Sequence, residues 1–389
     1  MLEFDVFSDI IESSVKNQKQ WGTSMNDIQY MQQALELAKK GAGHVNPNPL
    51  VGAVIVKENK IIGKGYHQKY GKPHAEVNAL TSLQESAAGA TMYVTLEPCS
   101  HYGKTPPCVD AIIKNNLKKV VIGSLDPNPL VAGRSIAKLQ AAGIEVETGI
   151  LKEECDELNT PFFHYITRKT PYVIMKYAMT SDGKIATHTG ASRWITGSEA
   201  RKKVHEDRNR YTGIMVGVGT IIADDPMLNC RIEIGRDPIR IICDTTLRTP
   251  TTSRIIETAK QIPTILLTAQ TAKQKQQPFI DKGCQIIPIP LKNNKLDLQS
   301  AMQILAKQGI DSILLEGGAT LNASALEAGI IQKVQVYIAP KLFGGASAPT
   351  PIAGLGVDHP DQAYKLTNKK ITILGEDTLI ESEMLDVRG

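Results

Sequence analysis

The sequence predicts two α/β domains, each built as a β-sheet with helices on its faces. The chain has 389 residues, enough for two domains of about 100 to 200 residues each. Short apolar runs typical of strands alternate with helical patterns through both halves, and this alternation favours layered α/β architecture. A proline-flanked stretch between Thr160 and Pro171 interrupts the alternation and indicates a boundary.

The first half begins with a helix and a hairpin. From Asn26, a residue typical of helix N-caps, apolar positions keep helical spacing until Gly41. Two β-like runs at 51–56 and 60–65, separated by a short turn, predict a β-hairpin. Further strands are expected at 91–96, 120–123 and 144–147, with helical patterns after His74, Cys108 and Gly133.

The second half restarts the alternation of strands and helices. The polar stretch 270–277 is expected to form an exposed loop or an exposed helix face. Strands are expected at 172–177, 213–218, 239–243, 264–267, 312–316 and 335–338.

Composition and charge narrow the class of protein. Hydrophobic residues make up 42% and charged residues 22% of the chain, as in typical globular proteins. The net charge is only +4, with 44 basic residues scattered among 40 acidic ones, so nothing favours a nucleic-acid partner. Six cysteines in so long a chain do not indicate a disulfide framework, and no run of about 18 apolar residues predicts a membrane span. We expect a cytoplasmic protein with no membrane partner.

The first 24 residues are excluded from the predicted fold. Acidic Glu3, Asp5 and Asp9 stand where a secretion signal would carry positive charge, so this stretch is not a signal peptide. Met25 directly precedes the first predicted helix. We expect residues 1–24 to be an extension that is disordered or not native.

One histidine, two cysteines and one glutamate give the strongest chemical signal. His74-Ala75-Glu76 stands before a helical run, Cys99 closes a strand, and Cys108 heads another helical segment. A hydrolytic zinc site needs three protein ligands, a vacant position for water and a carboxylate that moves protons without binding the metal. We therefore predict that His74, Cys99 and Cys108 hold one Zn²⁺ per chain. Glu76 is the predicted catalytic acid and base.

Two plainer interpretations stay open for these residues. Free cysteines are often small core residues, and a structural zinc would need a fourth ligand. His101, which lies between the two cysteines, is the candidate for that ligand. His44 and His67 are expected at the surface or on the substrate side rather than at the metal.

The four residues resemble the signature of the cytidine deaminase-like superfamily, His-x-Glu followed by Pro-Cys-x-x-Cys. Here the second cysteine comes nine positions after the first, a longer loop that is similar to the pyrimidine deaminases of riboflavin biosynthesis. The segments 46–52 and 126–133 both contain Pro-Asn-Pro-Leu-Val, and they strengthen the resemblance. It implies a three-layer cytidine deaminase-like domain at 25–168, with Asn46 binding substrate.

The second half is similar to the reductase part of bifunctional deaminase–reductases of bacterial riboflavin biosynthesis. This resemblance implies a dihydrofolate reductase-like domain at 169–389 and NADPH as its cofactor. The motifs that carry it are 176–186, 192–196, 223–226, 316–321 and 337–344.

Without the resemblance, the second half indicates only a nucleotide or phosphate ligand. It lacks the G-x-G-x-x-G fingerprint, and Gly217-Val-Gly219 is also explained by a tight turn between strand and helix. Gly317 and Gly318 precede a predicted helix start, where glycines let the backbone approach an anion.

The resemblance assigns the other site residues, and it leaves open whether Lys176 or Asp224 assists proton transfer. The implied substrate residues, whose two arginines would pair with phosphate, are Ser192, Arg208, Leu228, Arg231 and Glu316. The implied cofactor residues are Ala178, Trp194, Thr220, Asp224, Thr245, Gly318, Ala319, Thr320, Leu321, Asn322, Ala323 and Ser324.

The implied function is a bifunctional enzyme of riboflavin biosynthesis. It would deaminate 2,5-diamino-6-ribosylamino-4(3H)-pyrimidinone 5′-phosphate by hydrolysis and then reduce the ribosyl side chain with NADPH, giving 5-amino-6-ribitylamino-uracil 5′-phosphate. We expect small pyrimidine ribosyl phosphates as partners, no nucleic acid, and a homo-oligomer. The alternative is a deaminase of nucleic-acid bases whose C-terminal half is a non-catalytic module for ligand binding or oligomerisation.

Overall fold

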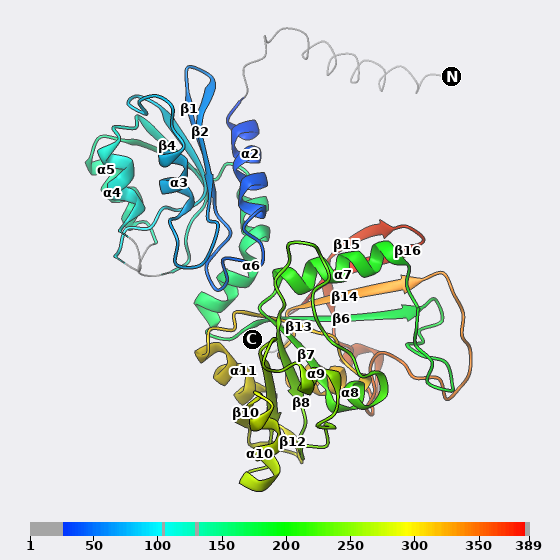
Figure 1. The fold of residues 1–389 in the computed structure, drawn as a ribbon. Helices are drawn as coiled ribbons and strands as arrows, with labels where there is room; N and C mark the ends of the chain where they lie inside the picture. Colours follow the sequence, from blue (N-terminus) through cyan, green and yellow to red (C-terminus); the bar gives the residue numbers. More distant parts are fainter. Residues whose placement is uncertain (1–25, 103–105, 129–131, 386–389) are drawn as a thin grey trace, which may run out of the picture. The chain divides into compact units, whose positions relative to one another are not determined.

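The computed structural model describes residues 26–102, 106–128 and 132–385, which form two compact units (Figure 1). The first unit holds Leu50–Leu158 and the chain before Ala42. The second holds Ala42–Pro49 and the chain from Asn159 onward. The extension expected at 1–24 lies outside the described residues.

The strands of the first unit are β1 (Gly52–Lys57), β2 (Lys60–Tyr66), β3 (Thr91–Leu96), β4 (Lys119–Ser124) and β5 (Glu145–Thr148). They form one sheet in the order β2-β1-β3-β4-β5. β1 pairs antiparallel with β2 and β3, whereas β3, β4 and β5 run parallel. The turn residues Glu58 and Asn59 both have positive φ, as the favoured two-residue hairpin turn requires. The expected hairpin is confirmed.

Helices cover both faces of this sheet. On one face α2 (Asp27–Lys39) and α6 (Lys152–Arg168) pack against β1, β3 and β4 in a common apolar core. On the other lie α3 (Ala75–Thr81), α4 (Cys108–Lys114) and α5 (Arg134–Ala141), as Figure 1 shows. The predicted three-layer architecture is confirmed.

Two local features fix α2 in place. Asn26 accepts a hydrogen bond from the Gln29 N–H, and the Gln29 side chain accepts one from the Asn26 N–H, which together form a capping box. A Cβ on Gly52 would lie 2.0 Å from the Ala34 carbonyl oxygen. Only glycine therefore lets α2 approach β1 so closely.

The stretch expected to be a boundary, from Thr160 to Pro171, is mostly helical. α6 continues to Arg168 with Pro161 inside it; this proline costs one backbone hydrogen bond but does not end the helix. The division into compact units falls inside α6, between Leu158 and Asn159. The domain limits 25–168 and 169–389 stay a proposal.

The main sheet of the second unit has the order β10-β9-β8-β7-β13-β6-β14-β16-β15. The strands from β10 to β14 in this order run parallel. At one edge of the sheet, β16 pairs antiparallel with β14, and β15 pairs antiparallel with β16. The strands are β6 (Tyr172–Thr180), β7 (Gly213–Gly217), β8 (Ile239–Cys243), β9 (Thr264–Thr268), β10 (Gln285–Pro288), β13 (Ser312–Leu315), β14 (Lys333–Ala339), β15 (Leu366–Leu374) and β16 (Asp377–Met384).

All six strands expected in this half are present. The structure adds β10, β15 and β16 to the sheet, and none of these three was expected from the sequence. Central parallel strands are buried on both faces and read as continuous apolar runs. β15 is exposed along most of its length, so it has no such run. A small hairpin of β11 (Leu291–Lys292) and β12 (Lys295–Leu296) was also not expected.

Helices cover both faces of the larger sheet too. α11 (Leu298–Lys307) and α12 (Ala319–Glu327) share a core with Val173, Met215 and Ile241. On the opposite face, Ile214 and Ile242 pack with α8, α9 and α10, and α7 packs near Tyr337. These helices are α7 (Ser198–Arg210), α8 (Val218–Asp224), α9 (Arg254–Glu257) and α10 (Lys273–Asp281).

The polar stretch 270–277 runs into α10 and is largely exposed, which agrees with the expected helix face. No helix in the described ranges combines the length and the hydropathy that a bilayer crossing requires.

Candidate functional sites

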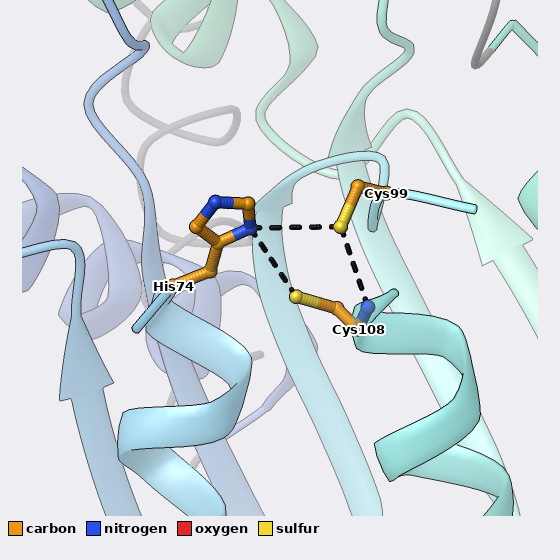
Figure 2. A group of neighbouring side chains, drawn as sticks. All are labelled: His74, Cys99 and Cys108. Carbon is orange, nitrogen blue, oxygen red and sulfur yellow. Dashed lines mark hydrogen bonds between the residues drawn. The ribbon is translucent and has the colours of Figure 1, made fainter. Parts of the chain in front are cut away.

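Three side chains with metal-binding atoms meet in the first unit (Figure 2). His74 is the N-cap of α3, Cys99 follows β3, and Cys108 begins α4. Nδ1 of His74 lies 3.5 Å from Sγ of Cys99 and 3.4 Å from Sγ of Cys108. The three ligand atoms all lie within 4.8 Å of one another. The structure thus brings together the three residues predicted to bind zinc.

Glu76 lies beside this group in the first turn of α3 and is 3% exposed. Burial raises the pKa of its carboxyl to about 7, and the charge of Cys99 adds to the effect. Among the described residues, its Oε2 has no hydrogen-bond partner. A buried polar atom is costly unless a partner occupies it, so this oxygen is suited to a bound water or substrate group.

The donor set fits zinc. One imidazole nitrogen and two sulfurs are the ligands of many catalytic zinc sites, with a fourth position left for water. A hydrogen bond from Cys108, opposed by burial and helped by a hydrogen bond from His74, lowers the pKa of the Cys99 thiol. This favours the thiolate, which is the form that binds metal.

Two buried carboxylates support the strand end that carries Cys99. Glu97 accepts hydrogen bonds from the Ser135 hydroxyl and, at 3.4 Å, from the Asp126 N–H. Asp126 accepts from the Asn128 N–H at 2.8 Å, and burial raises the pKa of Asp126 to about 6. In the sequence, Asp126 is visible only as part of a motif, because its burial depends on segments distant along the chain.

The other histidines divide clearly. His67 is 3% exposed, and its ring meets that of His74 edge-on with centroids 5.2 Å apart. A surface position for His67 is therefore wrong, while a substrate-side role stays a prediction. His101 and His44 are exposed. Within the described residues, the metal-binding group does not include His101, so the structure gives no support for it as a fourth ligand.

Asn46 lies in the segment 42–49, which belongs to the second unit. Its amide nitrogen lies 3.1 Å from Oδ2 of Asp311, a carboxylate that also accepts hydrogen bonds from Thr212 and Ser312. Asp311 is 2% exposed. The Asn46 amide group is therefore used for a structural contact, and its expected role in substrate binding stays a prediction.

A cavity of about 560 Å³ lies at the carboxyl ends of the parallel strands of the second unit. Its wall includes residues that follow β6, β13, β7 and β8, namely Ala186, Gly318, Val218 and Thr245. In open sheets of this kind, ligands bind at the carboxyl ends of the strands. The cavity is therefore the candidate cofactor site.

The backbone around Gly318 fits a phosphate-bearing cofactor. Gly318 precedes α12, and a Cβ there would lie 3.3 Å from Oγ1 of Thr220. Gly317 has φ +74°, and a Cβ there would lie 3.0 Å from the Asn322 amide group. Side chains at these positions would crowd the turn, whereas glycines leave the first N–H groups of α12 accessible to an anion.

Most of the expected cofactor residues lie in this wall, but several other predicted residues do not. Ala178 packs near Tyr337, Ala323 is buried, and Asn322 donates to the Pro351 carbonyl. The predicted residues that line the cavity are Ser192, Thr220, Asp224, Thr245, Gly318, Ala319, Thr320, Leu321 and Ser324. Those outside the wall are Ala178, Trp194, Asn322, Ala323, Arg208, Leu228, Arg231 and Glu316.

Glu316 is the centre of a buried ion cluster. The guanidinium of Arg208 donates to both its oxygens, at 2.7 and 2.9 Å, and Nζ of Lys176 lies 3.9 Å away. Burial alone would raise the pKa of Glu316, but Arg208 and Lys176 outweigh it and hold the pKa at about 2. Arg208 is thus paired with a carboxylate here, and its expected contact with a substrate phosphate stays a prediction.

The loop that carries Ser192 and Trp194 is fixed from a distant segment. Nζ of Lys341 donates to the carbonyl oxygens of Trp194 and Ile195, at 3.1 and 2.8 Å. The Arg201 guanidinium lies 4.7 Å from the Trp194 ring centroid, and the indole is 60% exposed. Lys341 was not singled out from the sequence, because its partners are backbone carbonyls.

Comparison with protein families gives two matches. Residues 171–380 match the RibD C-terminal domain, which is more than half of the chain. Residues 24–124 match the cytidine and deoxycytidylate deaminase zinc-binding region. The two matches fall on the two halves in which the two candidate sites lie.

Whole-chain relatives cover both halves. Riboflavin biosynthesis protein RibD of Actinobacillus pleuropneumoniae is 53% identical over 92% of this chain and 95% of its own. The solved RibD of Acinetobacter baumannii (form 1) is 40% identical, covers 92% of this chain and 99% of its own, and has a TM-score of 0.83. A Thermotoga maritima structure, titled as a diaminohydroxyphosphoribosylaminopyrimidine deaminase and 5-amino-6-(5-phosphoribosylamino)uracil reductase, is 38% identical over 92% of this chain and 99% of its own, with a TM-score of 0.79.

Proposed function

The chain belongs to the RibD family of riboflavin biosynthesis proteins, and on that premise we propose which residues carry out each of its two reactions. It is a bifunctional enzyme, a deaminase and a reductase. A nucleic-acid deaminase with a non-catalytic second half is not favoured, because RibD relatives match both halves over nearly their full lengths.

In the deaminase site we propose that His74, Cys99 and Cys108 hold one zinc ion. When bound, zinc supplies a Lewis acid that lowers the pKa of a water ligand to about 7. Glu76 accepts a proton from the attacking water and delivers it to the departing amino nitrogen. The substrate 2,5-diamino-6-ribosylamino-4(3H)-pyrimidinone 5′-phosphate thereby exchanges its 2-amino group for oxygen, and ammonia leaves.

In the reductase site the cavity beside α12 would hold NADPH, whose nicotinamide supplies hydride to C1′ of the ribosyl group. The N–H groups at the start of α12 bind the cofactor's diphosphate. Arg208 and Arg231 bind the sugar phosphate next to the cavity, and Glu316 holds the Arg208 guanidinium in place. The product is 5-amino-6-ribitylamino-uracil 5′-phosphate.

Lys176 is the better of the two candidates for the proton donor in this step. Burial lowers the pKa of its ammonium, although Glu316 opposes the shift. A lowered pKa makes an ammonium a stronger acid near neutral pH. Lys176 also lies 3.9 Å from Glu316, a predicted substrate residue, whereas Asp224 lines the cofactor cavity.

The observation that carries this proposal is the three-ligand group beside a buried carboxylate oxygen that has no partner among the described residues. The test supplies the diamino substrate to the purified protein and measures ammonia, then adds NADPH and measures its oxidation. Ammonia before NADPH, and oxidation only after deamination, are the expected results. NADPH oxidation without prior deamination would contradict the proposed order.

Removal of the metal separates a catalytic zinc from a structural one. A chelator should reduce ammonia release to background, while the reductase step with pre-deaminated substrate continues and far-ultraviolet circular dichroism stays unchanged. Unfolding of the chain on chelation would instead indicate a structural ion. Elemental analysis should find about one zinc per chain before treatment.

We also propose a homo-oligomer that works in the cytoplasm on small substrates without nucleic acid. All residues of 352–371 are exposed, among them the large apolar Leu355, Val357 and Leu366, and exposed apolar side chains gathered in one segment are a feature of many interfaces. Light scattering on the purified protein should give a mass of two or more chains. A monomer mass would refute the oligomer, and tRNA binding in gel shifts would refute the exclusion of nucleic acid.

A further inference from the structure

Two cationic side chains lie in the cavity wall of the second unit, and neither belongs to the predicted cofactor residues. Arg248 follows β8, and Lys295 lies on β12 of the small hairpin. Nζ of Lys295 is 3.0 Å from a carboxylate oxygen of Glu327. Among the described residues, the exposed guanidinium of Arg248 makes no ion pair. Arg248 is therefore a cation in the cavity wall that is not already neutralised.

The sheet order places Arg248 on the β8 side of the cavity. Most wall residues follow β8, β7, β13 and β6, which lie in that order in the sheet, and residues within 294–298 after β10 and Pro349 after β14 complete the wall. Ile185 and Ser192 belong to the chain after β6, and Arg248 belongs to the chain after β8. Three strand spacings separate these ends, roughly 14 Å at about 4.8 Å per spacing. The cavity is thus long enough to run along an extended dinucleotide.

The ion cluster shows which end is reactive. Lys176, the candidate proton donor, lies on β6, and Glu316, a predicted substrate residue, directly follows β13, so this ion cluster lies at the β6 side of the cavity. The hydride-donating nicotinamide must reach that side. The start of α12, which follows β13, is the natural place for the diphosphate. The adenosine half then extends past β7 toward β8 and Arg248.

We propose that Arg248 binds the 2′-phosphate of the cofactor's adenosine and thereby makes the reductase select NADPH over NADH. The two cofactors differ only in that phosphate. A guanidinium matches phosphate oxygens in a two-pronged, charge-assisted arrangement. The inference rests on the proposed function, because it assumes that the cavity holds a nicotinamide dinucleotide.

Substitution of Arg248 tests this selection. Arg248→Gln should raise the KM for NADPH by about 10- to 100-fold, the effect expected for losing hydrogen bonds to a charged group. The KM for NADH should change little, and ammonia release should be unaffected. Arg248→Lys should restore part of the NADPH affinity. Arg254→Gln, at an exposed arginine outside the cavity wall, should leave every parameter at the wild-type value.

A binding measurement on cofactor-free protein keeps the test independent of turnover. In calorimetry, wild-type protein should bind 2′,5′-ADP more tightly than ADP, and Arg248→Gln should remove that difference. Equal losses for 2′,5′-ADP and ADP, or for NADPH and NADH, would overturn the proposal, because they would place Arg248 at the diphosphate or in the fold. Unchanged binding would overturn it as well. If wild-type protein binds 2′,5′-ADP through Arg248 but never oxidises NADPH, the proposed function fails and the phosphate site remains.

Discussion

The two sites differ in how far apart along the chain their parts lie. In the first unit, His74, Cys99 and Cys108 are close in sequence, and their ligand atoms lie within 4.8 Å of one another. In the second unit, the cavity takes its wall from segments between Ile185 and Pro349. The first site is defined by the chemistry of a few side chains, and the second mainly by backbone turns at the ends of parallel strands.

Because of this difference, we expect substitutions in the two sites to affect their activities in different ways. A single substitution in the compact site should reduce one activity by several orders of magnitude, because no other residue can take over the lost role. In the extended site, affinity is divided among many contacts, so single changes should have graded effects. Because each site lies within its own compact unit, a change in one should leave the other activity intact.

The largest effect is expected for Glu76→Gln. The amide keeps the shape of the carboxylate but cannot accept the water proton, so ammonia release should fall by about 1,000-fold or more. Zinc content should stay near that of wild type, and the reductase step with pre-deaminated substrate should be unchanged. Glu36→Gln, at an exposed position of α2, serves as the control. Deamination within tenfold of wild type would remove Glu76 from its assigned role.

A smaller effect, in both stability and activity, is expected for Glu316→Gln. Arg208 and Lys176 would keep buried charges without a carboxylate, which should lower the free energy of unfolding of the second unit by about 3 kcal/mol. Misplaced substrate contacts should reduce reductase kcat/KM by about 100-fold. Trp194 fluorescence during urea unfolding, in a Trp21→Phe background, measures the first effect. Wild-type stability would show that the cluster is not the electrostatic centre described above.

A graded effect is expected for Lys341→Met, which removes the contacts to the carbonyls of Trp194 and Ile195. These hydrogen bonds are partly exposed to solvent, so their loss should weaken cofactor binding by about 1 kcal/mol. The KM for NADPH should therefore rise about fivefold. The kcat and the deaminase activity should stay within twofold of wild type. Lys341→Arg should recover most of the affinity. A change confined to kcat would mean that the lysine acts in the chemical step instead.

The smallest effect concerns pH and the second unit alone. Burial, with a contribution from Arg168, lowers the pKa of His164 to about 4 from the usual 6.5. Between these values the unfolded chain binds a proton that the folded chain does not, so stability falls as pH falls from about 6.5 to 4. His164→Gln should weaken this loss by about 0.7 kcal/mol between pH 7 and 6. Exposed His188→Gln should keep the wild-type slope, and identical slopes in all three proteins would contradict the prediction.

The sequence was enough to predict which three metal-binding side chains the structure brings together in the first unit. Residue type and positions at element ends indicated His74, Cys99 and Cys108, whose ligand atoms meet in the structure, whereas the role of Glu76 stays a prediction. The supporting carboxylates Glu97 and Asp126 were not predicted, since their burial comes from packing between distant segments. A pattern of residue types reports chemistry, whereas burial depends on tertiary structure.

The extended site was predictable only through the family resemblance. Gly317 and Gly318 alone indicated a phosphate ligand, but nothing local shows that Arg248 and Ser192 border one cavity. The strand order of the parallel sheet decides that. The core strands β6, β7 and β8 were predicted because buried parallel strands form continuous apolar runs. The strand β15 is exposed and has no such run.

The route of the chain through the segment Ala42–Pro49 limits how the two activities can be separated. This segment belongs to the second unit, although the chain on both sides of it belongs to the first. Its partners include Asn209, whose amide lies 3.4 Å from the Ala42 carbonyl oxygen, and Asp311, which binds Asn46. A gene split after residue 168 would therefore give an N-terminal polypeptide with a loop that has lost its anchors. Separate monofunctional proteins made from this chain would therefore require the loop 42–49 to be redesigned.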